Sequence, residues 1–295
     1  MRWLPDGALD HLKEVASEPD LAGTPYEIVG TIGQGGMGTV YLARDRDLDR
    51  EVALKVVQLH QEDTERLLRE ARILARLEHP GIVPVHDVGV LPDGRAWYVM
   101  KRVRGSRLDR SLSLPDRLRA FERICEAVAF AHAHGVIHRD LKPENVMVGP
   151  FGEVLVMDWG VARLQGTVEA PSIMGTPGYM APEQERGEME RIDERTDVYA
   201  LGAILSFLLE GEDRVPRPLA AVRSRAMAAE PEGRYSNVRE LSADLGRYLD
   251  GLPVAAYRES LLEQAARLFR RYRAPILIVL AYLLMRALLI LILGR

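Results

Sequence analysis

The residues best suited to chemistry lie in one short stretch of the 295-residue chain, from Val136 to Asn145. Within it, Asp140 follows a histidine and an arginine, and Asn145 comes five residues later. A carboxylate can accept the proton of a substrate hydroxyl, and an amide oxygen can bind a Mg²⁺ ion that bridges phosphate groups. The apolar residues 146–148 predict a short buried strand that would hold both side chains rigidly. These residue types suit phosphoryl transfer, with Asp140 as proton acceptor and Asn145 as metal ligand; an exposed polar turn is the alternative.

A second carboxylate and a lysine extend the same chemistry. Asp158 ends a strand predicted over residues 153–157 and lies 18 residues beyond Asp140. It would bind the Mg²⁺ that bridges the β- and γ-phosphates of a nucleotide. Lys55 stands in an earlier predicted strand, residues 51–57, and would hold the α- and β-phosphates as a point charge.

An amphipathic helix predicted over residues 62–78 offers a carboxylate partner for Lys55. Glu70 is the predicted partner. Glu65, about one turn earlier in the same helix, is the competing candidate.

A glycine-rich segment, residues 33–38, lies between strands predicted over 27–32 and 39–43. Glycines let backbone N–H groups approach phosphate oxygens that a side chain would keep away. Similar glycine spacing occurs in dinucleotide-binding folds, where a helix follows the glycines. Here the next residues are β-branched and aromatic, which predicts a hairpin and excludes a dinucleotide-dependent oxidoreductase.

The composition is that of an ordinary globular protein, with 47% hydrophobic and 28% charged residues. The formal net charge of −4 gives no support for nucleic acid as a partner.

The single cysteine, Cys125, cannot form an intrachain disulfide, and its apolar neighbours predict a buried thiol. His132 and His134 would point apart on a helix and are predicted to be structural. Residues 1–24 are predicted to be a polar extension without the apolar segment of a signal peptide.

Residues 274–294 form an apolar run that only Arg286 interrupts. Its 13 Leu, Ile and Val residues favour membrane insertion by about 4 to 8 kcal/mol, and a mid-helix arginine opposes it by about 2.5 to 3.5 kcal/mol. The run therefore predicts a single membrane-spanning helix; the alternatives are a helix buried against the preceding domain or one lying on the membrane surface. Residues 261–272 predict a basic amphipathic helix able to lie on anionic lipid. The positive-inside rule then places the preceding domain in the cytoplasm, because the run follows Arg267, Arg270, Arg271 and Arg273.

The order of several motifs resembles that of the bacterial eukaryotic-like (Hanks-type) Ser/Thr protein kinases. These motifs read Gly-Gln-Gly-Gly-Met-Gly at 33–38, His-Pro-Gly-Ile-Val-Pro-Val at 79–85, His-Arg-Asp-Leu-Lys-Pro-Glu-Asn at 138–145 and Gly-Thr-Pro-Gly-Tyr-Met-Ala-Pro-Glu-Gln at 175–184. The resemblance covers roughly Tyr26 to Leu249. It implies an α+β, bilobal protein-kinase fold. The β-rich N-lobe would span about 26–103 and the helical C-lobe about 104–250, followed by a juxtamembrane segment at 251–273 and the membrane helix.

The resemblance also implies the residues of the site, with ATP and Mg²⁺ as ligands. The implied catalytic residues are Asp140, Lys142, Lys55 and Glu70, and the implied metal ligands are Asn145 and Asp158. The implied ATP-binding residues are Ile32, Gly33, Gln34, Gly35, Gly36, Met37, Gly38, Thr39, Val40, Ala53, Lys55, Met100, Lys101 and Val103. Among these, Val40 would pack over adenine, Met100 would gate the pocket, and residues 101–103 would form the hinge.

The segment after Asp158 carries the implied regulatory and structural residues. The candidates for phosphorylation are Thr167, Ser172 and Thr176, with Arg139 as the partner of a phosphate. The implied structural residues are Glu183, Asp197 and Arg234. Asp197 would anchor the backbone of the catalytic loop, and Arg234 would pair with Glu183.

Two features depart from the family pattern. Trp159 occupies a position that is normally phenylalanine. After a buried helix predicted over 197–209, only 22 residues lie between Gly211 and Arg234, where the family has an additional helix that helps to dock protein substrates.

The complete catalytic set predicts an active, membrane-tethered signalling kinase that transfers the γ-phosphate of ATP to protein Ser/Thr hydroxyls and can phosphorylate itself. Lys142 and Thr176 indicate Ser/Thr rather than Tyr as the target. The alternative is an ATP-binding pseudokinase that acts as a membrane scaffold. The expected partners are protein substrates and a lipid bilayer, and homodimerisation is left open.

Overall fold

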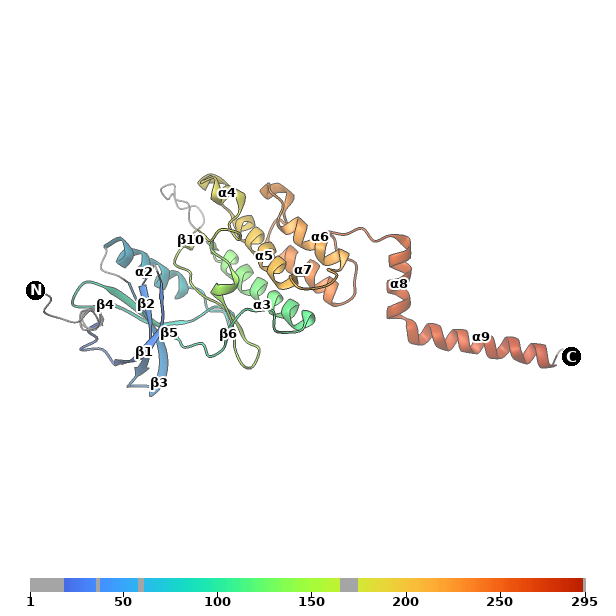
Figure 1. Ribbon diagram of the computed structural model, residues 1–295, viewed down its shortest axis with the longest axis horizontal. Helices are drawn as coiled ribbons and strands as arrows, with labels where there is room; N and C mark the ends of the chain where they lie inside the picture. Colours follow the sequence, from blue (N-terminus) through green and yellow to red (C-terminus); the bar gives the residue numbers. More distant parts are fainter. Residues whose placement is uncertain (1–18, 36–37, 58–60, 165–174, 294–295) are drawn as a thin grey trace, which may run out of the picture.

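The N-terminal lobe is a five-stranded antiparallel sheet with one helix against it (Figure 1). In the computed structural model, the described residues are 19–35, 38–57, 61–164 and 175–293. The strands lie in the order β1-β2-β3-β5-β4. Their bounds are β1 Tyr26–Gly35, β2 Gly38–Asp45, β3 Arg50–Val56, β4 Val85–Val90 and β5 Ala96–Lys101, and the helix is α2, Gln61–Leu74.

The register of the central strands places the expected nucleotide-binding side chains on one face of the sheet. Val40 on β2 lies opposite Lys55 on β3, and Lys55 lies opposite Tyr98 on β5. Two residues along, Ala53 lies opposite Met100. Directly opposed residues, and residues two apart on one strand, share a face of a sheet. The five side chains therefore line a single surface.

The opposite face of the sheet has its own apolar cluster. Tyr26 and Trp97 meet edge to face with their ring centroids 5.6 Å apart, and Leu54 beneath them is fully buried. A Cβ at Gly89 would lie 2.4 Å from the Trp97 ring, so this position on β4 requires glycine.

The C-terminal lobe is built around two buried helices, α3 (Leu114–Ala133) and α5 (Glu194–Leu209). Ser113 caps α3 by accepting a hydrogen bond from the backbone N–H of Asp116, and Pro115 in the first turn suits the helix start. The apolar face expected for α3, including Phe121, Ile124 and Cys125, is fully buried. The lobe is completed by α4 (Pro182–Glu185), α6 (Arg217–Ala226), α7 (Val238–Leu249), and the 3₁₀ turns η1 (Pro143–Asn145), η2 (Met189–Arg191) and η3 (Pro231–Gly233).

Short strands between the lobes carry the catalytic segments. β6 (Ser106–Arg107), β8 (Val146–Val148) and β9 (Val154–Val156) form one small sheet, and β7 (Val136–Ile137) pairs with β10 (Arg163–Leu164). The strand expected after Asn145 is thus present as β8, with the buried Val146 as its first residue.

The C-lobe is short after α5. Among the described residues, no helix lies between Leu209 and Arg217, and α6 packs directly on α5. At this contact a Cβ on Gly202 would lie 2.6 Å from the side chain of Met227. The expected loss of a helix is therefore seen, and the remaining helices close the gap.

The chain beyond α7 is held against the lobe as far as Tyr257. The buried carboxylate of Asp244 accepts hydrogen bonds from the backbone N–H groups of Ala255 (2.6 Å) and Ala256 (3.0 Å). It also accepts from the hydroxyl of Tyr235 at 2.8 Å. A buried carboxylate with three donors fixes the path of this segment.

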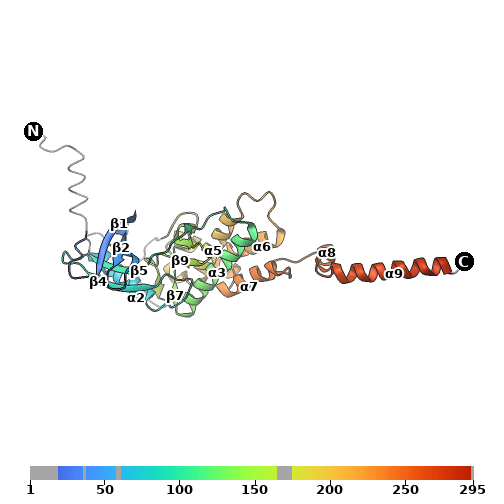
Figure 2. The same ribbon diagram turned by 90° about the horizontal axis from the view of Figure 1, so that it is seen from below.

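Two helices, α8 (Leu261–Arg271) and α9 (Arg273–Leu293), extend away from the C-lobe (Figures 1 and 2). Within the part of the chain that the structure describes, no helix combines the length and the apolar character needed to cross a membrane. Part of the predicted span, including the side chains of residues 290–294, lies outside that part. The alternative of a helix buried against the domain is wrong for α9, because its described apolar side chains, such as Leu284, are mostly exposed.

Several expectations fall outside the described residues. They concern the N-terminal extension up to residue 18, and the site residues Gly36, Met37, Thr167 and Ser172.

Candidate active site

Lys55 forms the centre of a buried charge cluster between the lobes. Its Nζ lies 3.0 Å from both carboxylate oxygens of Glu70 and 3.3 Å from Oδ1 of Asp158. The hydroxyl of Tyr98 donates a further hydrogen bond of 2.8 Å to Glu70. Glu65, the competing candidate, is exposed. The structure therefore brings together Lys55, Glu70 and Asp158, and adds Tyr98.

The charges of this cluster stabilise one another. Burial disfavours the charged form of Lys55, but the carboxylates of Glu70 and Asp158 outweigh burial and hold the pKa of Lys55 above its ordinary value. Burial likewise opposes the charge of Asp158, and the neighbouring Lys55 outweighs it and lowers the pKa of Asp158. Burial, reinforced by Glu70, raises the pKa of Tyr98 well above its ordinary value. At neutral pH the site thus holds the ammonium of Lys55, the carboxylate of Asp158 and the neutral phenol of Tyr98.

Asp140 lies in a second cluster with Lys142 and Thr176. The Thr176 hydroxyl donates to Oδ1 of Asp140 at 2.8 Å, and Nζ of Lys142 lies 2.9 Å from Oδ2 of Asp140 and 2.6 Å from the Thr176 oxygen. The two oxygens of Asp140 are thereby held in place from both sides. Thr176 is one of the three residues predicted as candidates for phosphorylation; its hydroxyl contacts Asp140, and a phosphate on it would lie beside that carboxylate.

Asn145 and Asp158 supply oxygen atoms suited to a divalent cation. The Asn145 amide nitrogen donates to the backbone carbonyl of Asp140 at 2.9 Å, which leaves the amide oxygen as the atom to contact a metal. Asp158 has a left-handed backbone, with φ of 55°, and a partly exposed carboxylate. Among the described residues no group of three or more His, Cys, Asp or Glu side chains forms a complete metal site. One amide and one carboxylate fit Mg²⁺, which takes its remaining ligands from phosphates and water.

The backbone of the catalytic loop is held by Asp197 of α5. Its fully buried carboxylate accepts hydrogen bonds from the backbone N–H of His138 (2.8 Å) and of Arg139 (2.9 Å). It also lies 2.8 Å from Nε2 of His132 on α3. Burial opposes the charge of Asp197, but the hydrogen bond and charge of His132 outweigh burial and lower the pKa of this aspartate. Both the anchoring role expected for Asp197 and the structural role expected for His132 are present.

Trp159 is accommodated without disturbing Asp158. The indole is 1% exposed, packs against the His138 ring in a tilted arrangement with centroids 4.5 Å apart, and donates from Nε1 to the Val156 carbonyl at 3.4 Å. The ring nitrogens of His138 in turn lie near the Met157 carbonyl (3.1 Å) and the Asp140 backbone nitrogen (3.3 Å). Trp159 therefore packs against the residue that supports the catalytic aspartate.

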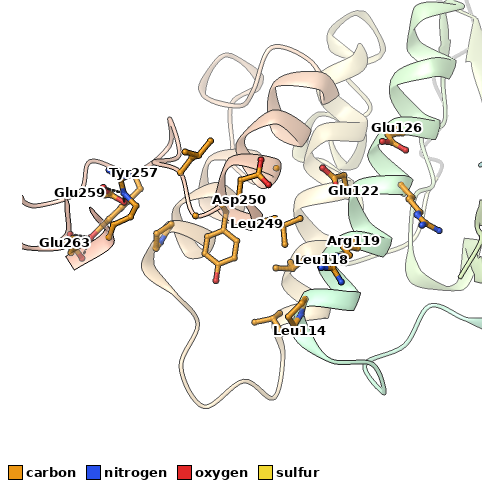
Figure 3. Close-up of a pocket in the computed structure, with 18 residues that line it drawn as sticks. Leu114, Leu118, Arg119, Glu122, Glu126, Leu249, Asp250, Tyr257, Glu259 and Glu263 are labelled. Atoms are coloured by element: carbon orange, nitrogen blue, oxygen red, sulfur yellow. Dashed lines mark hydrogen bonds and ion pairs between the residues drawn. The ribbon is translucent and has the colours of Figure 1, made fainter. Parts of the chain in front are cut away.

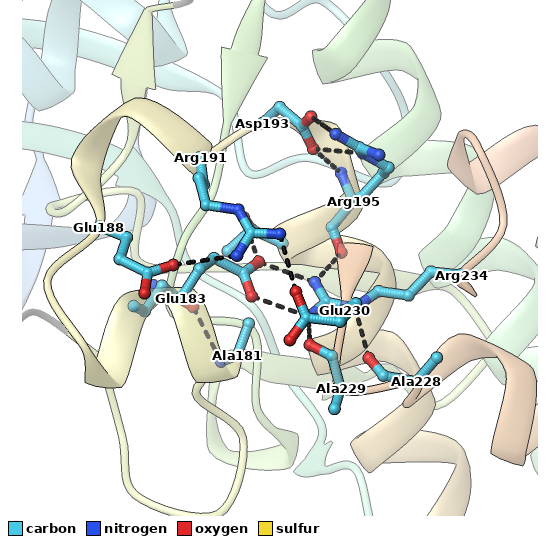
Figure 4. Close-up of polar contacts among 12 residues, drawn as sticks. Ala181, Glu183, Glu188, Arg191, Asp193, Arg195, Ala228, Ala229, Glu230 and Arg234 are labelled. Atoms are coloured by element: carbon cyan, nitrogen blue, oxygen red, sulfur yellow. Dashed lines mark hydrogen bonds and ion pairs between the residues drawn. The ribbon is translucent and has the colours of Figure 1, made fainter. Parts of the chain in front are cut away.

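A buried ion pair ties the end of the segment after Asp158 to the C-lobe (Figure 4). Nη1 and Nη2 of Arg234 each lie 2.7 Å from one oxygen of Glu183, and both side chains are fully buried. The Thr196 hydroxyl donates to Glu183 at 3.0 Å, and Arg234 donates to three backbone carbonyls, those of residues 195, 228 and 229. The pair expected from the sequence is thus present with its hydrogen-bonding groups satisfied, which a buried ion pair requires.

The other positions expected to contact a nucleotide lie on the sheet of the N-lobe and just after it. Ala53 and Met100 are buried on the face of the sheet that carries Lys55, whereas Ile32 on β1 is 54% exposed. β5 ends at Lys101, where the expected hinge to the C-lobe begins. The other expected contacts are Gly33, Gln34 and Gly35 on β1, Gly38 and Thr39 on β2, and Val103 after β5.

Sequence reasoning missed three supporting residues. Tyr98 lies within an uninterrupted apolar strand and gave no signal of a polar role. Thr196 and Gln184 bind Glu183 and the Arg139 carbonyl respectively. Only the tertiary fold brings these donors to their partners.

A bilobal fold with a paired lysine, a metal-binding aspartate and asparagine, and an anchored catalytic aspartate defines a protein phosphotransferase domain. The sequence model of the family described as "Protein kinase domain" matches residues 26–241. The chain belongs to the protein kinase family. This family implies ATP binding and, typically, Mg²⁺, with proteins as substrates.

Three curated bacterial proteins, each named Serine/threonine-protein kinase PknD, are similar to this chain. The protein of Chlamydia caviae is 36% identical over an alignment 295 residues long, and this alignment covers 77% of this chain and 31% of the relative. The protein of Chlamydia trachomatis serovar D is 33% identical over an alignment 326 residues long, which covers 86% of this chain and 34% of the relative. The protein of Protochlamydia amoebophila is 32% identical over an alignment 297 residues long, which covers 77% of this chain and 30% of the relative. The chain spans about a third of the length of these relatives. Its domain is a Hanks-type protein Ser/Thr kinase domain, homologous to that of the PknD kinases, and the predicted enzyme class, a transferase, is confirmed.

Proposed function

We propose that this protein is an active Ser/Thr kinase that transfers the γ-phosphate of ATP to hydroxyl groups of proteins, its own included. The observation that carries the proposal is the joint placement of Lys55 on Glu70 and Asp158 with a hydrogen-bonded Asp140 in the facing loop. A chain used only as a scaffold has no physical need for this complete arrangement.

The chemistry assigns one task to each residue. Asp140 takes the proton of the substrate hydroxyl while the oxygen of that hydroxyl forms a bond to the γ-phosphorus. The bond between the γ-phosphorus and the oxygen that bridges it to the β-phosphate breaks, and ADP is released. Lys55 holds the α- and β-phosphates, and Lys142, beside Asp140, offsets negative charge on the group in transfer. Asn145 and Asp158 would hold Mg²⁺, which would supply further neutralisation of phosphate charge.

The contact between Lys142 and Thr176 supports Ser/Thr as the target. These two side chains occupy the space beside Asp140 and hold its carboxylate close to the loop. A lysine and a threonine at these two positions resemble the Ser/Thr kinases, which favours Ser/Thr over Tyr as the target.

Phosphate transfer from radiolabelled ATP with Mg²⁺ by the full chain tests the proposal, with Asp140→Asn as the control. Label on Ser or Thr that is lost in the control is expected. Binding of ATP without transfer would favour the alternative of a pseudokinase scaffold, which the short C-lobe and Trp159 motivate.

We further propose that residues 274–294 attach the chain to a membrane as a single pass, with the kinase domain in the cytoplasm. The support is the net apolar insertion energy of this run and the arginines that precede it. Within the described part of α9, apolar side chains such as Leu277 and Leu284 are more than half exposed. Burial of these side chains in lipid would remove this apolar surface from water.

Extraction of membranes with alkaline carbonate tests this attachment. The full chain is expected to stay with the lipid, and a variant with Leu280→Arg and Leu284→Arg is expected to be released, while Ala281→Ser in the same helix stays. Release of the unaltered chain would contradict the attachment.

A further inference from the structure

Helix α8 meets the kinase domain through its polar side (Figure 3). The two carboxylate oxygens of Glu263 lie 2.9 and 3.1 Å from the hydroxyl of Tyr257, and Oε1 lies 3.4 Å from Nη1 of Arg217 at the start of α6. One turn further on, Nε of Arg267 lies 3.0 Å from a carboxylate oxygen of Glu259. These ion pairs and hydrogen bonds fix one side of α8 to the linker and the C-lobe.

The apolar side of α8 faces away from the domain. Leu261 and Leu262 are 83% and 84% exposed, and Leu268, Phe269 and Tyr272 are each about half exposed. At 3.6 residues per turn these five positions share one side of the helix, opposite Glu263 and Arg267. A helix of a globular domain normally turns its apolar stripe to the core. In α8 this arrangement is reversed.

A cavity beside α8 could have received the apolar side of this helix. It has a volume of about 1010 Å³ and lies between the first half of α3, the end of α7 and α8, with leucines 114, 118 and 249 in its lining (Figure 3). The residues through which α8 borders it are Glu263 and Arg267, and not the leucines of the helix. The lining also contains charged side chains, such as Arg119 and Glu122. Leucine side chains are thus available beside α8, yet the apolar side of α8 is turned elsewhere, so it is suited to a partner outside the domain.

We propose that α8 is a docking surface for an anionic lipid bilayer, on which it lies with its apolar side in the headgroup boundary. Four arginines and a single glutamate fall within residues 261–273, which matches negative lipid and would make two copies of α8 repel each other. The exposed apolar side also continues into the exposed apolar side chains of α9, beginning with Leu277. The proposal rests on the proposed membrane attachment. It adds that contact of α8 with lipid sets the orientation of the kinase domain relative to the membrane.

The linker holds α8 beside the C-lobe. Its backbone at Ala255 and Ala256 is bound to the buried Asp244, and the side chains of Tyr257 and Glu259 hold α8. The N-lobe and α8 lie on opposite sides of the C-lobe in both views (Figures 1 and 2). Docking through α8 therefore places the base of the C-lobe near the lipid and keeps the candidate active site away from it.

Site-directed spin labelling of the full chain tests the proposal, because Cys125 is the only cysteine, is fully buried, and has a pKa raised by burial. A nitroxide is attached to Phe269→Cys on the apolar side or, as the matched control, to Gln264→Cys on the polar side. Collisions with oxygen and with a water-soluble nickel chelate are measured without lipid and on mixed phosphatidylcholine and phosphatidylserine vesicles. On these vesicles the label at 269 is expected to gain oxygen contact and lose nickel contact severalfold, while the label at 264 stays open to nickel.

Three results would overturn the proposal. A label at 269 that remains open to nickel on the vesicles, in a chain that resists carbonate extraction, would mean that α9 attaches the protein and α8 does not touch lipid. A label at 269 shielded from both reagents without lipid would mean that α8 packs into the cavity or, if the shielding depends on protein concentration, on a second copy. Failure to bind vesicles at all would remove both α8 docking and attachment. Kinase activity measured in parallel with Phe269→Glu is expected to be unchanged in detergent, which separates the lipid contact from catalysis.

Discussion

The hydroxyl of Thr176 donates a hydrogen bond of 2.8 Å to Oδ1 of Asp140, and so links the segment that precedes α4 to the catalytic aspartate. Lys142 completes the contact by binding both residues. A carboxylate that must receive a proton in a defined direction depends on such supports, because misplacement of about 1 Å can cost about 100-fold in rate.

Replacing Thr176 with valine is expected to lower kcat for a peptide substrate by about 10- to 100-fold, because Oδ1 of Asp140 loses its hydrogen bond from the Thr176 hydroxyl while the side-chain volume is kept. Thr176→Ser should restore most of the rate, since it keeps the hydroxyl. Steady-state kinetics at saturating ATP measures both. A valine variant as fast as the unaltered protein would show that Thr176 does not position Asp140.

Removing the charge of Glu70 is expected to impair nucleotide use. In Glu70→Gln, Lys55 keeps only Asp158 as a charged partner and is drawn toward it, away from the α- and β-phosphates. We expect a raised KM for ATP and a kcat lowered by about 10- to 100-fold. Glu65→Gln is the matched control, because it lies on the same helix and is exposed. Equal effects of the two substitutions would contradict the assignment of Glu70.

The choice between these two glutamates illustrates what the sequence could predict. Periodicity places both on one helix, and the motif context predicts Glu70, which is the residue that the structure places on Lys55. The rotation of α2 that turns Glu70 to Lys55 depends on distant residues. The motifs around Asp140 and Asp158 can be recognised in the sequence because their spacing is local. Tyr98 was missed since an apolar strand gives no sign that one hydroxyl meets a buried carboxylate. The sequence likewise predicted that α8 is amphipathic, but not that its polar side is the one bound to the domain.

The indole of Trp159 is expected to stabilise both the fold and the catalytic loop. Trp159→Phe removes the hydrogen bond to Val156 and leaves a small void against His138. We expect a loss of about 1 to 3 kcal/mol in the free energy of unfolding, as for other large-to-small changes in a core. Denaturant unfolding measures the loss, and peptide kinetics should show a smaller decrease in kcat than Thr176→Val. A phenylalanine variant of equal or greater stability would show that the larger ring carries no structural advantage.

The Glu183–Arg234 pair should make stability depend on pH. Burial opposes the charge of Glu183, but the hydrogen bonds from Arg234 outweigh it and hold the pKa of Glu183 below its ordinary value of 4.5. At a pH between the pKa of Glu183 in the folded chain and its ordinary value of 4.5, the unfolded chain binds a proton that the folded chain does not. Acid therefore favours unfolding. The contribution of this pair is therefore fully present above pH 4.5 and is lost as the pH falls through the folded pKa.

Comparison of Glu183→Gln with the unaltered protein isolates this effect, because the other carboxylates are common to both. At neutral pH the variant is expected to be less stable by about 3 to 5 kcal/mol, since Arg234 is left buried without its counter-charge. The difference in unfolding free energy should narrow as the pH falls below 4.5. Glu188→Gln, which alters a partly exposed partner of Arg186 and Arg191 in the neighbouring network (Figure 4), should change stability by less than about 1 kcal/mol. A stability difference for Glu183→Gln that stays constant down to acid pH would show that the charge of Glu183 is not what holds Arg234 in the core.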